Sequence, residues 1–275
     1  MKRGVHVPNL NWVEDVADSG LEPFRSVRDR DLAGRANLFM VEGEVALRVL
    51  VRHGRFPLSA LLLSERRVKA LTSLLADLPD QTPVYVVPHH AIEEIVGFKM
   101  HRGVLGCGQR ILGPSLDATL ADLSVHVQRV VLTEAVSNTD NMGAIFRNVA
   151  AFGGGAVLLD QQSCDPLYRK AIRVSSGQTL ALPFCRGGTV LELVESVRRV
   201  GFQVAALTPC EAATPIKEWK NPPDRLALLV GAEGPGLSDA ALASADHRLA
   251  IPMATSVDSL NVATSVAVAM HQLQP

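Results

Sequence analysis

Cysteine is scarce in this chain, and its scarcity excludes two common kinds of site. There are four cysteines in 275 residues, with no CxxC pair and no histidine at the spacing of a zinc site. They are Cys107, Cys164, Cys185 and Cys210. Neither a disulfide framework nor a structural metal site is expected, and the thiols are expected to be reduced. The histidines offer no metal site either, because His89 and His90 are adjacent and their side chains diverge in a helix or a strand.

Long apolar runs are also missing. No stretch reaches the roughly 18 uninterrupted apolar residues that a membrane-spanning helix needs. The opening residues, MKRGVHVPNLNWVEDV, lack the apolar middle part of a secretion signal. The sequence therefore predicts a cytoplasmic protein without a membrane segment.

An excess of positive charge is lacking as well. The 27 Lys and Arg residues stand against 28 Asp and Glu, a net charge of −1, whereas bulk electrostatic binding of nucleic acid needs a strongly basic face. Any contact with RNA must then be local. Two groups of basic residues could supply such a local contact. The first group is Arg25, Arg28, Arg30 and Arg35, and the second is Lys99, His101 and Arg102. An equal alternative to an RNA-contacting surface is that these basic residues are ordinary solvated charges beside acidic neighbours.

The apolar content of 47% is enough to bury two cores. Apolar residues at helical or strand spacing divide the chain into four parts. These are an arm over 1–20, a first α/β domain over 21–110, a linker over 111–124 and a second domain over 125–275. In the first domain we expect helices over 37–53, 65–76 and 91–96 and strands over 58–63, 84–87 and 104–107.

In the second domain, apolar strands alternate with helices, and this pattern predicts a mainly parallel sheet with helices on both faces. The strands are expected over 129–132, 156–159, 203–207, 226–230 and 247–251, and the helices over 142–152, 189–200 and 261–273. Such a sheet could bind a dinucleotide, but GxGxxG is missing after its first strand, and the chain has neither a P-loop nor a GxSxG elbow. Gly153, in the run FGGGAVLL, more simply ends a helix.

Three loops crowded with Gly, Pro, Ser and Asn lie beside apolar runs of the second domain, where α/β sheets place their chemistry. The first leads into the helix that holds Asn141, Gly143 and Arg147. Asp140 or Asn141 can cap this helix, and Arg147 lies one turn beyond Gly143 on about the same side. By itself the segment describes an ordinary capped helix with a surface arginine.

The second loop, GAEGPGL over 231–237, follows a strongly apolar strand. Three glycines and a proline around Glu233 indicate a rigid turn whose backbone is open to a ligand. A tight loop in which Ser238 caps the next helix explains the glycines. It does not explain a charged side chain at the end of a buried strand.

The third loop runs from Ile251-Pro252-Met253, which ends a strand, to Asp258-Ser259-Leu260-Asn261-Val262, which opens a helix of small apolar residues. Its local pattern predicts Ser259 as the helix cap and Asn261 as a polar residue of the first turn.

Together the three segments resemble the SpoU/TrmH family of SPOUT-type RNA ribose 2'-O-methyltransferases. The first matches the family pattern Asn-x-Gly-x-x-x-Arg, the second is similar to the motif with an active-site Glu, and the third matches IPM…SLNV. Asp258 stands where the family commonly has Glu. The likeness covers the chain from about residue 24 to its end. Further matching segments are FMVEG over 39–43, SSG over 175–177 and LP over 182–183. HRGV over 101–104 also matches, with Arg in place of the family's Gln.

This resemblance implies a fold and a reaction. The second domain would be a SPOUT-type trefoil-knotted sheet, an exception to the rule that chains do not thread, and the first a smaller, ribosomal-protein-like α/β RNA-binding domain. The protein would transfer a methyl group from S-adenosylmethionine to a ribose 2'-hydroxyl of structured rRNA or tRNA without a metal ion. It would be a homodimer through the second domain. The apolar face expected there consists of Val262, Val266, Ala269, Met270 and Leu273.

The resemblance also implies a role for each matching residue. The catalytic residues would be Asn141, Arg147, Glu233, Ser259 and Asn261. The cofactor would lie against Leu207, Thr208, Gly231, Glu233, Ile251, Met253, Ser259 and Leu260. RNA would be contacted by Arg25, Arg28, Arg30, Arg35 and Arg147. Because an arginine stays protonated in proteins, we assign Arg147 to stabilising the ribose oxyanion and gripping phosphate, with Glu233 orienting it.

The sequence also bears on three other functions. A catalytically silent RNA-binding protein could keep the same fold as a scaffold, and binding of S-adenosylmethionine would separate the two. An antibiotic-resistance methylation of ribosomal RNA is compatible with the same motifs. A nicotinamide-dependent enzyme is not, because the phosphate-binding fingerprint is missing. The sequence specifies neither the target RNA nor the proton acceptor.

Overall fold

The computed structural model describes residues 10–25, 37–100, 102–111, 116–121, 123 and 127–274. The chain forms two compact units. Met1–Leu112 and Leu167–Ala181 form the first, and Gly113–Pro166 and Leu182–Pro275 the second. The segment Leu167–Ala181 was expected in the second domain but makes its contacts in the first unit. Of the expected linker, residues 112–115, 122 and 124–126 lie outside the described residues.

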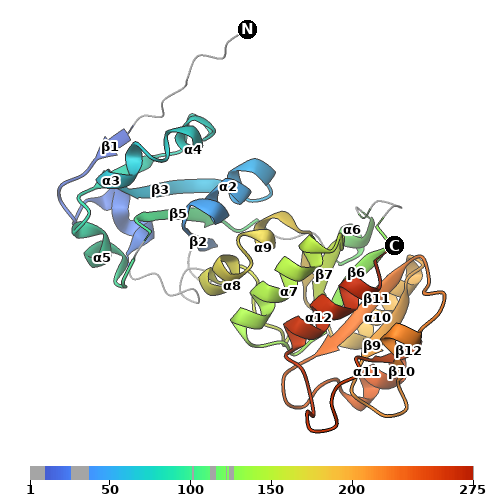
Figure 1. Ribbon diagram of the computed structural model, residues 1–275. Helices are drawn as coiled ribbons and strands as arrows, with labels where there is room; N and C mark the ends of the chain where they lie inside the picture. Colours follow the sequence, from blue (N-terminus) through green and yellow to red (C-terminus); the bar gives the residue numbers. More distant parts are fainter. Residues whose placement is uncertain are drawn as a thin grey trace. The chain divides into compact units, whose positions relative to one another are not determined.

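The first unit contains a five-stranded sheet in the order β1-β4-β3-β5-β2 (Figure 1). The strands are β1 (Leu10–Trp12), β2 (Leu38–Glu42), β3 (Leu58–Ser64), β4 (Val84–Val87) and β5 (Val104–Gln109). β1, β4 and β3 run parallel, whereas β5 is antiparallel to both β3 and β2. The helices are η1 (Ser19–Phe24), α2 (Glu44–His53), α3 (Glu65–Val68), α4 (Thr72–Ala76), α5 (Ala91–Val96), α8 (Arg169–Val174) and α9 (Gln178–Ala181).

Three expectations for this unit are wrong. Residues 10–20 are not a loose arm, because β1 pairs with β4 and the helix η1 buries Leu21 and Phe24 completely; residues 1–9 lie outside the described residues. The helix expected over 37–53 is β2 followed by α2. Gly43, at φ +92°, separates the two elements, and the apolar residues on its two sides imitate a helical period by chance. The helix expected over 65–76 is likewise broken into α3 and α4.

The helices α8 and α9 pack onto the N-terminal part of this unit. α9 lies against α2, and α8 against β2. At Gly177, which has φ +86°, an added Cβ would come within 3.0 Å of the Ala46 backbone. The buried carboxylate of Glu42 accepts a hydrogen bond from Arg173 at 3.5 Å. Residues 167–181 are thus part of the folded first unit.

The second unit is built on a seven-stranded, all-parallel sheet in the order β10-β12-β9-β11-β6-β7-β8. The strands are β6 (Arg129–Glu134), β7 (Ala156–Leu159), β8 (Phe184–Arg186), β9 (Gln203–Leu207), β10 (Thr214–Pro215), β11 (Leu226–Gly231) and β12 (His247–Ala250). The helices are α6 (Leu116–Ala121), α7 (Thr139–Ala151), α10 (Val190–Arg199), η2 (Ile216–Glu218), α11 (Asp239–Ser244) and α12 (Val262–Gln272). The expected α/β class and parallel sheet are confirmed.

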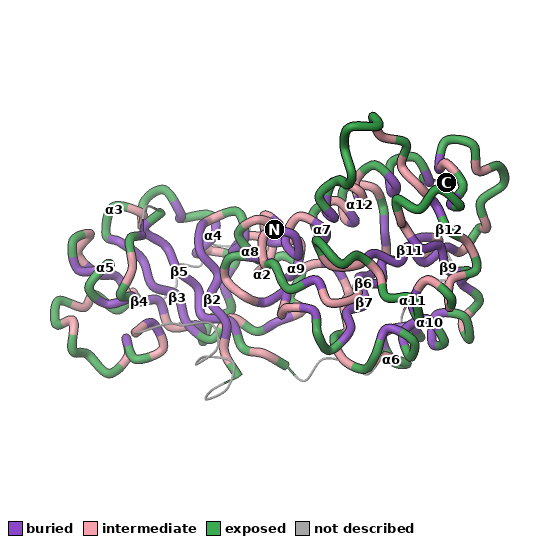
Figure 2. Tube along the Cα trace, turned by 90° about the horizontal axis from the view of Figure 1, so that it is seen from below, coloured by how far each residue is buried: buried purple, intermediate pink, exposed green. Residues whose placement is uncertain are grey.

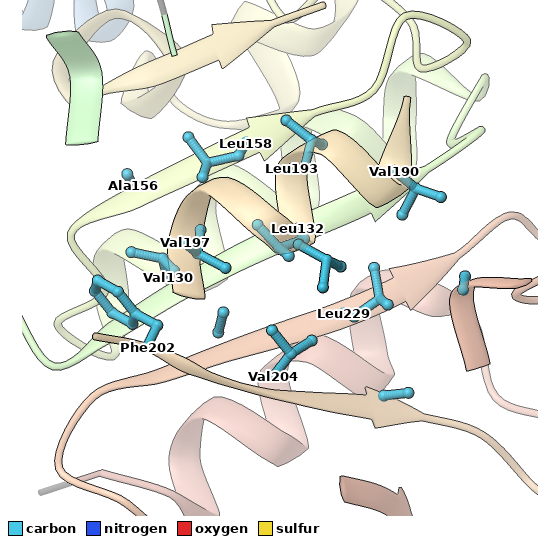
Figure 3. Packing of buried hydrophobic residues seen from close by; sticks show 14 of the residues in the cluster. Val130, Leu132, Ala156, Leu158, Val190, Leu193, Val197, Phe202, Val204 and Leu229 are labelled. Carbon is cyan, nitrogen blue, oxygen red and sulfur yellow. The ribbon is translucent and has the colours of Figure 1, made fainter. Parts of the chain in front are cut away.

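Helices cover both faces of this sheet. On one face α10, α6 and α11 pack onto residues of β6, β7, β9 and β11, as Figure 3 shows for the cluster around Leu132 and Leu193. On the other face α7 and α12 lie side by side. The central strands of both sheets are buried along their length (Figure 2). None of the helices in the described part of the chain is long and apolar enough to cross a bilayer.

The apolar stripe of α12 is used inside the chain. The five residues expected on a free face, Val262, Val266, Ala269, Met270 and Leu273, are all at most 7% exposed. Val268, on the opposite side, is 40% exposed. The stripe therefore faces the core of its own unit and does not argue for a partner chain.

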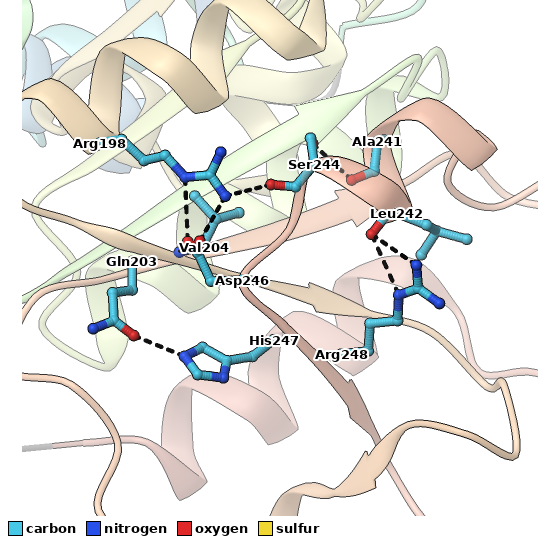
Figure 4. A network of polar contacts seen from close by, with 9 residues as sticks. All are labelled: Arg198, Gln203, Val204, Ala241, Leu242, Ser244, Asp246, His247 and Arg248. Carbon is cyan, nitrogen blue, oxygen red and sulfur yellow. Dashed lines mark hydrogen bonds and ion pairs between the residues drawn. The ribbon is translucent and has the colours of Figure 1, made fainter.

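A polar network fixes the start of β12 next to β9 (Figure 4). The Asp246 carboxylate accepts a hydrogen bond from the Val204 backbone N–H at 2.7 Å and one from Arg198 at 2.6 Å. Burial alone would raise the pKa of Asp246, but these hydrogen bonds and the charges of Arg198 and His247 outweigh it, and the pKa is lowered. α10, β9 and β12 are thereby held together, and the carboxyl ends of β9 and β12 form part of the site described next.

Candidate active site

A cavity of about 540 Å³ lies at the carboxyl ends of β9, β11 and β12. Because neighbouring strands of a parallel sheet end at one edge, the loops that follow them converge there, where open α/β sheets bind ligands. All eight residues predicted to bind the cofactor line this cavity. They are Leu207, Thr208, Gly231, Glu233, Ile251, Met253, Ser259 and Leu260. The structure thus brings together residues up to 53 positions apart in the chain, from Leu207 to Leu260.

The wall after β11 is a closed loop. Ala232 and Gly236 form an antiparallel bridge, and the Gly236 N–H donates to the Ala232 carbonyl at 3.1 Å. Gly234 and Gly236 have φ values of +88° and +72°, which favour glycine. At Gly231 an added Cβ would run into the backbone of Gly236. The missing side chain at Gly231 is therefore required by the loop itself, and not only by the approach of a ligand.

Asn261 ties this loop to two helices. Its side-chain oxygen accepts from the N–H groups of Ala263 at 2.9 Å and Thr264 at 3.2 Å, so it caps α12. Its amide nitrogen donates to Asn141 at 2.8 Å and to Glu233 at 2.6 Å. An amide has two N–H donors and one oxygen acceptor, and all of them are engaged here. The expectation that Ser259 caps this helix is wrong.

Asn141 can reach Asn261 because another residue caps α7. Asn138 accepts from the N–H groups of Asp140 at 2.8 Å and Asn141 at 3.4 Å. The cap was expected from Asp140 or Asn141 themselves. Asn141 is instead buried, 6% exposed, with its side-chain oxygen on Asn261. Asn141, Glu233 and Asn261, which come from the three sequence motifs, therefore form one chain of hydrogen bonds.

Arg147 stands apart from this chain of hydrogen bonds. It is exposed on α7, and within the described residues no hydrogen bond or ion pair joins it to Glu233 or to any other group. The Glu233 carboxylate bonds Asn261 in place of the expected arginine. None of the N–H donors of the Arg147 guanidinium is used by a described residue.

Ser259 and Leu260 belong to the exposed segment between β12 and α12, which borders the cavity. Further walls come from residues that sequence reasoning missed, among them Leu237 and Leu242. Leu242 lies on α11, a helix foreseen only through its cap, Ser238, which accepts from the Ala241 N–H at 3.1 Å. The apolar spacing of such a short helix gives little signal, so Leu242 could be found only from the fold.

The basic residues expected to contact RNA differ in availability. The Arg25 guanidinium donates to the carbonyls of Val16 at 2.5 Å and Asp18 at 2.8 Å and to the Glu22 carboxylate at 3.3 Å, so three of its five donors are used within the first unit. Three others, Arg28, Arg30 and Arg35, lie outside the described residues, as does His101. Lys99 and Arg102 are exposed and bond no described residue. Among the described residues no cluster of His, Cys, Asp and Glu could hold a metal ion.

Comparison with known proteins identifies the chain. The model of the SpoU rRNA methylase family matches residues 128–271. An uncharacterized tRNA/rRNA methyltransferase of Mycobacterium bovis is 35% identical over 271 residues, which cover 94% of this chain and 91% of that protein. The chain belongs to the SpoU rRNA methylase family.

The chain is also similar to two proteins whose activity or structure is known. The 23S rRNA (adenosine(1067)-2'-O)-methyltransferase of Streptomyces azureus is 33% identical over 156 residues, covering 56% of this chain and 57% of that protein. The crystal structure of an AdoMet-bound rRNA methyltransferase from Sinorhizobium meliloti has a TM-score of 0.80 at 20% identity, over 96% of this chain and 97% of that one. This SpoU family member is thus a methyltransferase, and its fold is that of the Sinorhizobium rRNA methyltransferase.

The Gly-rich loop gives a test of the cavity. Gly231→Ala should displace the Gly236 backbone and with it the cavity wall, so the affinity for S-adenosylhomocysteine should fall by about tenfold or more. Calorimetric titration of the folded variant measures this. Gly153→Ala is the control, because Gly153 has φ +76°, open space around it and no part in the cavity. Equal affinities for the Gly231 variant and the wild type would place the cofactor elsewhere.

Proposed function

We propose that this chain transfers a methyl group from S-adenosylmethionine to a ribose 2'-hydroxyl of structured RNA. The observation that carries the proposal is the hydrogen-bonded chain Asn141–Asn261–Glu233 beside the cavity. It joins the three motifs that the sequence shares with SpoU/TrmH enzymes, at the edge of the sheet where a ligand would bind. A relative named as a 2'-O-methyltransferase of 23S rRNA supports the ribose hydroxyl as the acceptor.

The cavity fits the cofactor in size and in chemistry. Ligand pockets for molecules of this size span about 300 to 1,000 Å³ and are mostly apolar with a few polar groups, and this one measures about 540 Å³. Leu207, Leu242 and Ile251 supply apolar surface for the adenine of the cofactor. Thr208, Ser259 and backbone groups of the Gly-rich loop supply polar contacts. When bound, the sulfonium supplies an activated methyl group, so no metal ion is needed to make the methyl transferable.

The residues of this chain have to align and stabilise the ribose hydroxyl. Arg147 remains protonated and cannot be the base. Its exposed guanidinium, which bonds no described residue, is suited to gripping an RNA phosphate and stabilising the oxyanion that develops on the ribose. Phosphate or water then accepts the proton. The hydroxyl of Ser259 is available to the substrate at the rim of the cavity.

Asn141, Asn261 and Glu233 are better described as positioning residues. The Asn261 side chain has no hydrogen-bonding group left over for substrate, and Asn141 is buried beneath it. The second oxygen of Glu233 has no partner among the described residues and can still bind a ligand. Together they hold the Gly-rich loop and the start of α12 at a fixed distance from α7, on which Arg147 stands.

The substrate is proposed to be ribosomal or transfer RNA, with 23S rRNA as the first to test because of the Streptomyces relative. A trefoil knot in the second unit stays a prediction. The cytoplasm is the expected location, since such RNA is found there. The alternative of a catalytically silent RNA-binding protein would be supported if S-adenosylhomocysteine failed to bind.

Arg147→Ala should lower methyl transfer by about a hundredfold or more, the usual scale for removing an oxyanion-stabilising group. Its affinity for S-adenosylhomocysteine should be unchanged, because Arg147 does not line the cavity. Transfer of labelled methyl to RNA and calorimetry measure the two effects. Arg199→Ala, an exposed arginine on α10, is the control. A variant of Arg147 with near-normal transfer would remove it from the mechanism.

We assign RNA recognition to the first unit. Lys99 and Arg102 are exposed there and bond no described residue, so Lys99→Ala with Arg102→Ala should weaken RNA binding and reduce the slope of log affinity against log salt by about 1.5. The control, Lys217→Ala with Lys220→Ala, removes the same charge from exposed sites of the second unit. If both pairs had the same effect, general charge and not a local surface would govern binding.

We also propose a homodimer formed by the second unit, as the sequence resemblance implies. With the apolar stripe of α12 buried, the exposed side of that helix, which carries Val268, is the part available to a partner copy. Light scattering at micromolar concentration should report twice the chain mass of 29.5 kDa. A monomer with full activity would overturn this assembly.

A further inference from the structure

The carboxylate of Glu134 holds the far end of the Gly-rich loop. Glu134 is the last residue of β6, and in the parallel register it lies opposite Gly231, the last residue of β11. Its two oxygens accept from the same residue, Ser238, through the backbone N–H at 2.8 Å and the hydroxyl at 2.7 Å. The loop therefore leaves the sheet at Gly231 and is bonded again to the neighbouring strand seven residues later.

Because Ser238 is held by Glu134, the cavity-lining residues before and after it in the chain are held in place as well. Its hydroxyl also accepts from the Ala241 N–H at 3.1 Å and so starts α11. Leu237, immediately before it, and Leu242, one turn after it, both line the cavity. A cap on α11 needs only the oxygen of Ser238. The carboxylate of Glu134 is not needed for the cap, so its two bonds serve the position of the loop.

The turn that follows β6 fixes the direction of the Glu134 side chain. Ala135 adopts φ +55°, a strained conformation for a residue with a Cβ. Its N–H donates to the buried carboxylate of Asp160 at 3.0 Å, and Asp160 also accepts from the N–H and the hydroxyl of Ser163. This buried cluster turns the chain sharply after β6, so the end of β6 and the Glu134 side chain are held toward β11.

We propose that Glu134 is a positioning residue for the cofactor-binding wall, acting through Ser238. Glu134 does not line the cavity, and both of its oxygens are bonded to Ser238, so we assign it no contact with the cofactor or with the reacting atoms. Without it, the described bonds between the loop over 232–237 and the sheet would be those at its entry, and the bond from Asn261 to Glu233 would hold the loop from the side of α12. The cavity would then be formed in only a fraction of the molecules, and affinity falls in proportion to that fraction. The inference rests on the proposed function, because it concerns the same cofactor.

Variants of the two partners test the proposal. Glu134→Ala removes both bonds and should raise the dissociation constant of S-adenosylhomocysteine by about tenfold. Glu134→Gln keeps an acceptor for the Ser238 N–H and should lie between Glu134→Ala and the wild type. Ser238→Ala removes only the hydroxyl bond, and its effect should not add fully to that of Glu134→Ala, because the two changes break a shared interaction. The KM for S-adenosylmethionine should rise in step, while kcat at saturating cofactor stays within about twofold of the wild type.

The chain offers a matched control. One oxygen of Glu192 accepts from the backbone N–H of Thr189 at 2.6 Å and from its hydroxyl at 3.0 Å, so the same two kinds of donor bond a glutamate at the start of another helix, α10, away from the cavity. Glu192→Ala should therefore cost stability without changing cofactor affinity. Amide hydrogen exchange over residues 232–240 should accelerate in Glu134→Ala and not in Glu192→Ala.

The outcomes separate the two proposals. If the wild type binds neither S-adenosylmethionine nor S-adenosylhomocysteine, the proposed function fails. If the wild type binds and Glu134→Ala binds equally well, the role of Glu134 is overturned while the function stands. A fall in kcat without a rise in KM would also overturn it, because that result would place Glu134 in the chemical step.

Discussion

The parallel, in-register pairing of β11 with β6 is the constraint on which the site depends. It places Gly231 level with Glu134, so the Gly-rich loop after β11 and the turn after β6 start at the same height on the same edge of the sheet. α7 follows that turn, and α12 packs beside α7. Asn261 can then bond both Asn141 and Glu233. A shift of one residue in this register would turn alternate apolar side chains to the wrong face and separate these partners.

The sequence predicts the elements whose signal is local. Three strands, β4, β7 and β9, have the bounds expected from their apolar runs. The prediction failed where the signal was absent or misleading. A three-residue strand such as β1 is defined by its partner β4, which lies more than seventy residues away. At β2 and α2 one helical period ran across Gly43, whose backbone conformation cannot be read from periodicity.

The candidate site also has a part that the sequence predicts and a part that it does not. Which residues line the cavity follows from the motifs, because the loops after parallel strands meet at one edge of the sheet. Which side chain bonds which does not follow. Asn138 rather than its neighbours caps α7, and Glu233 bonds Asn261 rather than Arg147. Choices between polar groups one or two residues apart depend on hydrogen-bond distances and angles, which a sequence pattern does not contain.

The discontinuity of the first unit has a consequence for how the chain is made. Residues 167–181, which contribute Ile172 and Leu180 to its interior, are synthesised after β6, α7 and β7 of the second unit. On the ribosome, where domains generally fold from the N-terminus onward, the first unit cannot reach its final form when residue 112 emerges. It must wait until residue 181 is available, with the second unit already begun. Neither unit corresponds to one uninterrupted piece of the gene.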